Sequence, residues 1–162
     1  MTKLRDQVLE FSKAFGVIER ATPGVPDDDT VRLRLRLIAE EFVELLDACN
    51  LDTADVHDAI FKCIADYPLH GCAGREEGKS VYLEAFADAC ADLDYVVEGS
   101  RLAFGIDGEP IADEVHAANM RKLGPDGRPI YRESDRKVIK PKGWIGPNHE
   151  PILIAQGWEP AT

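Results

Sequence analysis

The stretch from Val31 to Asn50 constrains the fold most, because nothing in it interrupts a helix. It contains no glycine or proline, and from Ile38 onward its apolar side chains recur at helical spacing. Its first part, residues 31–38, alternates apolar and basic residues as a strand does, but no breaker separates the two parts. We therefore predict one helix of about 20 residues, longer than average but within the usual range. Asp29 or Thr30 is expected to cap its start.

Four further segments have apolar residues at helical spacing, and each has a plausible start or stop signal. The expected ranges are about 4–15, 53–67, 80–104 and 110–120. Thr53 can cap the helix that it precedes, Gly16 and Gly105 can end helices, and Pro110 suits a first helical position. The sequence therefore predicts an all-α bundle.

The remaining residues form a tail of different character. It is rich in proline and glycine, and we expect it to be irregular, apart from a small hairpin between residues 131 and 139. We predict a helical core domain at residues 1–123 and a basic C-terminal extension at residues 124–162 that packs on the core.

Composition narrows the classes of protein that the chain can belong to. Hydrophobic residues make up 44% and charged residues 30%, as in ordinary globular proteins. No apolar run approaches the ~20 residues of a membrane span, and the N-terminus is charged, unlike a signal peptide. We therefore expect a cytoplasmic protein that does not bind membranes. The four cysteines lack a C-x-x-C spacing, which favours reduced thiols in the core over zinc ligands or disulfides.

Charge is distributed unevenly along the chain. The formal net charge is −11, which argues against a nucleic-acid-binding protein. Residues 121–142 nevertheless contain eight lysines and arginines against three acidic residues. An acidic body with a basic segment can bind nucleotide phosphates through bridging cations and a few local lysines or arginines.

Two of the predicted helices carry closely spaced carboxylates. Glu40, Glu41 and Glu44 lie within five residues of one helix, at spacings that place pairs of them on one side. A second helix repeats the pattern with Glu84, Asp88 and Asp92 at i, i+4 and i+8. Paired antiparallel, the two helices could present four or five oxygen ligands to a hard cation. Carboxylates without histidine favour Mg²⁺, for which Mn²⁺ could substitute.

The same pattern has a simpler reading. A chain with 30 acidic residues produces such pairs by chance on the solvated faces of surface helices. Two acidic stripes, each beside apolar positions, favour a metal site but leave the surface-charge reading open. A further polar set on the predicted fifth helix, His116, Asn119 and Lys122, could contact phosphate, and an exposed helix end explains it about as well.

Several motifs together resemble the MazG-like all-α NTP pyrophosphatase superfamily, in its branch similar to phosphoribosyl-ATP pyrophosphatase. The resemblance covers most of the chain. The central motif is Glu40-Glu41-x-x-Glu44, followed by the second acidic helix and by Asn119-x-x-Lys122. Others are Phe11-x-x-x-Phe15-Gly16, the run at residues 35–41, Asp92-x-x-Tyr95, the run at residues 104–107, Glu114-Val115-His116 and the run at residues 127–130.

This resemblance implies a fold, an oligomeric state and a reaction. The fold would be a bundle with a four-helix core, a short fifth helix and the tail, assembled into a homodimer or a tetramer. The reaction would be hydrolysis of a nucleoside triphosphate, such as dUTP, dCTP or dGTP, to the monophosphate and pyrophosphate. Phosphoribosyl-ATP is an alternative substrate, and a non-catalytic helical module that binds cations or nucleotides is an alternative role.

The resemblance also implies roles for individual residues. Glu41, Glu44 and Asp92 would be metal ligands, and Glu40 a ligand or the base that orients water. The usual second motif is Glu-x-x-Asp, but Ala89 stands three residues before Asp92, so Asp88 or Glu84 would supply the missing carboxylate. Substrate phosphates would contact Asn119, Lys122, Lys137 and Lys140. Phe11, Phe15 and Trp144 could stack on a base or belong to the core.

Overall fold

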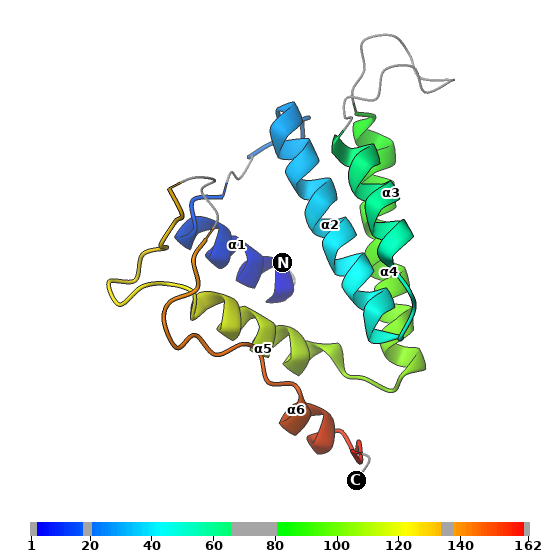
Figure 1. The fold of residues 1–162 in the computed structure, drawn as a ribbon, viewed down its shortest axis with the longest axis vertical. Coiled ribbons are helices and arrows are strands. Elements are labelled where there is room, and N and C mark those ends of the chain that lie inside the picture. The colour runs from blue at the N-terminus through cyan, green and yellow to red at the C-terminus, as the bar shows by residue number, and fades with distance from the viewer. Residues whose placement is uncertain (1–2, 18–20, 66–80, 134–137, 161–162) are drawn as a thin grey trace. The chain divides into compact units, whose positions relative to one another are not determined.

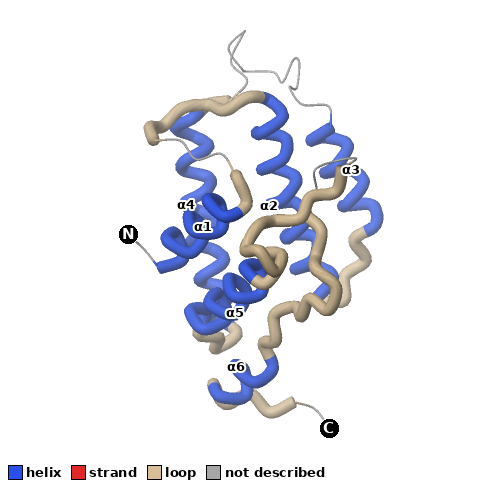
Figure 2. Tube along the Cα trace, turned by 90° about the vertical axis from the view of Figure 1, so that its left-hand side faces the viewer, coloured by secondary structure: helices blue, strands red, loops and turns tan. Residues whose placement is uncertain are grey.

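The computed structural model describes residues 3–17, 21–65, 81–133 and 138–160, and these residues form helices and loops without a strand (Figures 1 and 2). The prediction of an all-α fold is therefore confirmed. The helices of this described part are α1 (Lys3–Ala14), α2 (Asp28–Ala48), α3 (Ala54–Ala65), α4 (Leu83–Ala103), α5 (Gly108–Met120) and α6 (Glu150–Ala155). None of them is both long enough and apolar enough to cross a membrane.

The chain divides into two compact units. The first comprises residues 1–21 and 90–162, and the second comprises residues 22–89. The boundary falls within α4, so that its first turns belong to the second unit and the remainder to the first. The predicted C-terminal extension lies in the same unit as α1 and α5. We describe each unit by itself.

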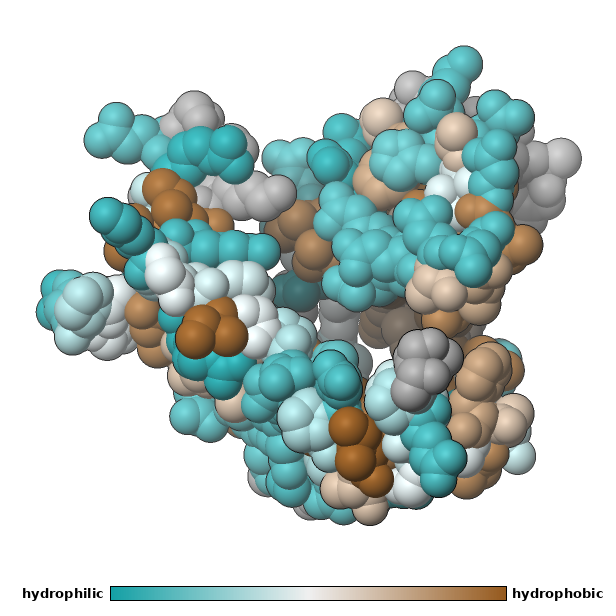
Figure 3. All heavy atoms as spheres, turned by 60° about the horizontal axis from the view of Figure 1, so that its bottom comes forward, coloured by the Kyte–Doolittle hydropathy of each residue, from teal (hydrophilic) through white to brown (hydrophobic). Residues whose placement is uncertain are grey.

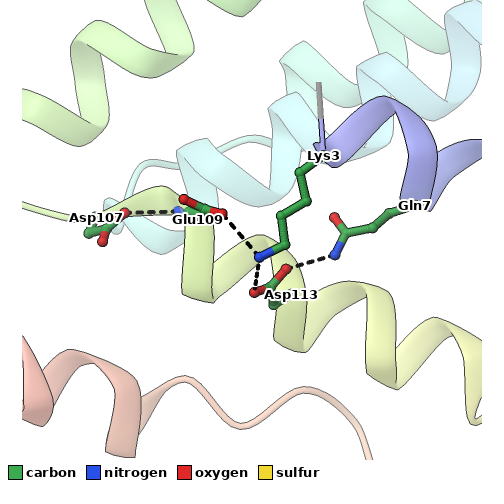
Figure 4. A network of polar contacts seen from close by, with 5 residues as sticks. All are labelled: Lys3, Gln7, Asp107, Glu109 and Asp113. Carbon is green, nitrogen blue, oxygen red and sulfur yellow. Dashed lines mark hydrogen bonds and ion pairs between the residues drawn. The ribbon is translucent and has the colours of Figure 1, made fainter. Parts of the chain in front are cut away.

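In the first unit, α1 packs against α5 through polar contacts at its start (Figure 4). The Lys3 ammonium donates to Glu109 at 3.0 Å and to Asp113 at 2.7 Å. Gln7, one turn further along α1, donates to the other oxygen of Asp113 at 2.7 Å. The hydrogen bond from Lys3, followed by that from Gln7, lowers the pKa of Asp113. The bond to Asp113 raises the pKa of Lys3 in turn.

The end of α1 is held by apolar and backbone contacts. Phe15 is only 4% exposed and stacks on Phe11, with the ring centroids 4.1 Å apart. The Tyr131 hydroxyl donates to the Phe15 carbonyl at 2.5 Å, which ties the tail to this point. Gly16 follows with a φ of 60°, so it supplies the left-handed conformation expected of a helix stop. Phe15 thus belongs to the core, which was one of the two predictions for it.

In the second unit, α2 packs against α3. Val31, Ala39 and Val43 are its buried residues, which confirms the helical reading of the alternating segment. The expected cap was wrong by two or three residues. Asp27 caps α2, accepting from the Thr30 amide at 2.8 Å and from the Thr30 hydroxyl at 2.9 Å. Both bonds lower the pKa of Asp27, and the bond from the Thr30 amide has the larger effect.

The start of α5 also differs from its prediction. Asp107 caps the helix by accepting from the Glu109 amide at 3.0 Å, so α5 begins at Gly108 and Pro110 is its third residue. Proline fits there because the amides of a first helical turn have no partner within the helix. Thr53 does precede α3, but its hydroxyl donates to Asp47 at 2.5 Å.

The tail is more ordered than its composition predicts. Two antiparallel bridges, Leu123 with Pro129 and Tyr131 with Val138, give it a hairpin-like course. The last twenty residues are not irregular throughout, because they contain α6, with Pro151 in its first turn. Gln156, just after α6, accepts from the Asp107 amide at 2.9 Å and donates to the Asp107 carbonyl at 3.1 Å. The tail therefore packs on the start of α5.

Candidate active site

The three glutamates of α2 are positioned by the buried face of that helix. Ala39 and Val43 are buried, so Glu41 and Glu44 stand on exposed parts of the helix. Glu40 is half-exposed and pairs with Arg36 one turn earlier, at 3.5 Å. The helix thus presents a row of carboxylates to solvent, with one arginine beside Glu40.

The carboxylates of α4 are also exposed. Glu84, Asp88 and Asp92 follow one another at one-turn intervals on this helix. Within the described residues, no group of three or more His, Cys, Asp or Glu side chains is placed to hold a metal ion. The structure therefore gives each predicted ligand its place on a helix, and the choice between Asp88 and Glu84 stays open.

The end of α5 carries the predicted phosphate-binding pair. The Lys122 ammonium donates to the Asn119 side-chain oxygen at 2.7 Å, and both residues are half-buried. This bond fixes the orientation of the Asn119 amide, whose nitrogen remains a donor. The third residue of the predicted set, His116, has its Nε2 3.3 Å from a carboxylate oxygen of Glu10 on α1.

The tail places an aromatic ring and a second lysine beside this pair. The indole nitrogen of Trp144 donates to the Ala118 carbonyl at 2.9 Å. The Lys140 ammonium lies 4.2 Å from the centroid of the indole ring, and that of Lys122 lies 5.7 Å from it. Lys137, the other predicted lysine of the tail, lies outside the described residues. The sequence pattern does not predict that Trp144 lies beside both of these lysines.

An ion pair fixes the backbone that follows Trp144. Arg121 donates to Glu114 at 2.9 Å and to the Ile145 and Gly146 carbonyls, each at 3.2 Å. Glu114 also accepts from the Asn148 amide at 3.1 Å. The bond from Arg121, followed by that from Asn148, lowers the pKa of Glu114. These contacts hold the segment 144–148 against α5.

Among the described residues, the cysteines belong to no group that could hold a metal ion. Cys49, Cys63 and Cys90 are free thiols, as expected. The expectation that they belong to the core is wrong for Cys49 and Cys63, which are exposed. Cys72 lies outside the described residues.

A sequence model of a known family matches this chain from within α1 to within α5. The model is that of phosphoribosyl-ATP pyrophosphohydrolase, and the match extends over residues 8–119. The chain belongs to this family. It is similar throughout to the crystal structure of a candidate NTP pyrophosphohydrolase from Exiguobacterium sp. 255-15, with 32% identity and a TM-score of 0.72. That comparison covers 96% of this chain and 94% of the other. No curated protein matches the chain.

As a member of this family, the protein is a hydrolase that acts on pyrophosphate bonds. The family match includes the carboxylates of α2 and α4 and ends at Asn119. The structural similarity extends beyond it into the tail, which contains Lys140 and Trp144. The tail of this chain is therefore a part of the shared fold.

Proposed function

We propose that this protein is a metal-dependent nucleoside triphosphate pyrophosphatase that releases pyrophosphate and a nucleoside monophosphate. The observation that carries the proposal is the similarity of fold over nearly the whole of both chains. A deoxynucleoside triphosphate such as dUTP, dCTP or dGTP is the favoured substrate. The protein is proposed to act in the cytoplasm, in keeping with its free cysteines.

The proposed metal ligands are Glu41, Glu44, Asp88 and Asp92. Their chemistry fits Mg²⁺, which prefers oxygen ligands and keeps several waters, and Mn²⁺ would suit the same donors. Their exposure fits as well, because a triphosphate must reach the ion from solvent. When bound, the ion would neutralise phosphate charge and lower the pKa of coordinated water.

The residues of the chain would carry out the proton transfer and bind the phosphates. Glu40 accepts a proton from the attacking water, whose oxygen forms a bond to the α-phosphorus. The bond between that phosphorus and the bridging oxygen breaks, and pyrophosphate leaves in line with the attack. Asn119, Lys122 and Lys140, with Lys137 from the same segment, bind the phosphate oxygens and balance their charge.

We further propose that the enzyme is a homodimer or a tetramer. The support comes from α4 and the turn after it, which expose large apolar side chains. Tyr95 is 81% exposed, Leu102 72% and Phe104 79%. Figure 3 shows apolar side chains (brown) among hydrophilic ones on one face of the molecule. A second copy of the chain would cover such residues, since exposed apolar patches mark interaction surfaces.

Phosphoribosyl-ATP is the second candidate substrate, because the matching family model bears its name. It contains the same phosphoanhydride bonds, so the same residues would serve its hydrolysis. The choice between the candidates depends on how the base and sugar are recognised.

A substrate panel tests the proposal. The protein is incubated with each NTP and dNTP and with phosphoribosyl-ATP, with Mg²⁺, with Mn²⁺ or with EDTA. Pyrophosphate and orthophosphate are measured separately. We expect equal amounts of pyrophosphate and monophosphate from a dNTP, and none with EDTA. Orthophosphate without pyrophosphate, or no product from any substrate, would refute the proposal, and turnover of phosphoribosyl-ATP alone would select the second candidate.

A further inference from the structure

Several contacts fix Trp144, which is half-buried, at the point where the end of α5 meets the tail. Its indole N–H donates to the carbonyl of Ala118, which is only 1% exposed. Gly146 lies against the far edge of the ring, where an added Cβ would come within 3.4 Å of it. Arg121 holds the carbonyls of the two residues that follow Trp144. The ring therefore has a defined position relative to the end of α5.

A tight turn brings Lys140 to this ring. The Trp144 amide donates to the Pro141 carbonyl at 2.9 Å, which closes a four-residue turn over residues 141–144. Gly143, the third residue of the turn, has a φ of 79°, as a type II turn requires. The chain thus reverses between Lys140 and Trp144, and the Lys140 ammonium comes to lie 4.2 Å from the ring centroid.

Lys122, just after the end of α5, also approaches this ring. Its ammonium lies 5.7 Å from the centroid and is directed by its bond to Asn119. The two ammonium groups therefore both lie within cation–π range, about 6 Å, of the centroid of one indole ring. Like charges repel, but the negative face of an indole attracts cations, and this attraction reduces the cost of gathering them. An ammonium has three donors and no acceptor, so the pair is suited to a polyanion.

We propose that Trp144 is a positioning residue that gathers the ammonium groups of Lys122 and Lys140 for the phosphate chain of the substrate. The inference rests on the proposed function and deepens it. It assigns to the tail a part in substrate binding, through a ring that does not itself touch the reacting atoms. The lysines act on the ligand, and Trp144 acts through the lysines.

Two substitutions distinguish the contribution of the aromatic ring from that of its N–H hydrogen bond. W144L and W144F both remove the indole N–H, but only phenylalanine retains an aromatic face. We expect W144L to raise the KM for the nucleotide about tenfold, with kcat within about twofold of the wild type. W144F should recover most of the loss. Circular dichroism and the melting temperature of both variants show whether the fold is retained.

A double-mutant cycle shows whether Trp144 acts through Lys140. K140M and W144L are each expected to raise KM, and the double variant should raise it by less than the product of the two effects. If the increase in KM of the double variant equals the product of the two single increases, the ring serves only to hold the tail. That result would overturn the proposal. Equal KM values for the wild type, W144F and W144L would overturn it as well.

Binding of inorganic tripolyphosphate distinguishes failure of this inference from failure of the proposed function. Calorimetry should give about tenfold weaker binding to W144L than to the wild type, whatever the enzyme hydrolyses. In W158F, Trp144 is the remaining tryptophan, and its fluorescence should change when tripolyphosphate is added. Trp144-dependent binding without pyrophosphate release would refute the proposed function alone. Binding that does not depend on Trp144, or no binding, would refute the inference.

Discussion

The acidic helices and the basic group at the end of α5 are organised in opposite ways. The carboxylates of α2 and α4 are exposed, and among the described residues they form no metal-binding group. Lys122 and Lys140, in contrast, already lie around one indole ring. The difference follows from what each set has beside it. An aromatic face can gather cations without a counter-ion, whereas closely placed carboxylates repel one another until a cation arrives.

The largest effect should follow from removing a carboxylate ligand. We expect E41Q and D92N each to lower kcat/KM on the order of 100-fold or more, since even changes beside metal ligands cost 10- to 100-fold. E98Q, which alters an α4 carboxylate paired with Arg101, is the matched control and should retain activity. Near wild-type rates in E41Q or D92N would remove these residues from the site.

The same variants test whether the carboxylates gather around an ion. Mg²⁺ should raise the melting temperature of the wild type and of E98Q, because a ligand that binds only the folded state stabilises it. The rise should be lost in E41Q and in D92N. A rise of equal size in all four proteins would mean that the ion binds elsewhere.

A smaller effect is expected from the lysines. K122M should raise KM roughly 10- to 100-fold, and K140M about tenfold, since each removes a charge-assisted contact to phosphate. K142M changes the same net charge two residues further along, at an exposed lysine, and should leave KM within about twofold. If K142M and K140M have equal effects, the basic segment acts by its overall charge and the arrangement around Trp144 is irrelevant.

The turn that carries Lys140 should be sensitive to its glycine. G143A forces alanine to a φ of 79°, at a cost of roughly 1 kcal/mol, and we expect KM to rise a few-fold as Lys140 is displaced. G127A places alanine at a φ of 73° in another turn of the tail and should cost similar stability. A change of KM in G127A as large as that in G143A would show a general loosening of the tail. Steady-state kinetics and thermal unfolding measure both effects.

The smallest effect concerns the contacts between α1 and α5. We expect K3M and D113N to lower the melting temperature at pH 7 by no more than about 3 °C, because exposed ion pairs contribute little. K13M, on the same helix, is the control. The pKa of Asp113 is lowered from its ordinary value of 3.8, so its contribution is present above that value and lost as the pH falls through the lowered pKa. The difference between D113N and the wild type should therefore shrink as the pH falls through the lowered pKa and vanish well below it.

The helices could be predicted because their apolar spacing and glycine stops are local signals. Their starts were harder to predict. Asp27, Asp28 and Asp29 are all suitable caps, and the choice depends on which of them leaves the Thr30 amide within reach. The short α6 was concealed by the prolines around it, although a proline in the first turn favours a helix.

Contacts of the candidate site between residues close in sequence could be predicted, whereas those between residues far apart in sequence could not. Asn119 lies in the last turn of α5 and Lys122 in the turn that follows the helix, so their contact follows from a spacing of three residues. The grouping of Lys140 with Lys122 depends on how the tail returns to Ala118, which no local pattern specifies. The signal that could have suggested it is the sequence Lys140-Pro-Lys-Gly-Trp144, in which proline and glycine frame a reversal.

The contacts of Lys3 with α5 have a consequence for the order of folding. They join residues 106 and 110 positions apart in sequence, so α1 cannot dock until α5 has been synthesised. At translation rates of about 5–20 residues per second, α1 waits for its partner on the order of 5–20 s after it emerges from the ribosome. During that interval Phe11 and Phe15 have no tail to cover them. The first helix to be synthesised is thus among the last to reach its native contacts. Its charged side chains keep this part of the nascent chain hydrated until then.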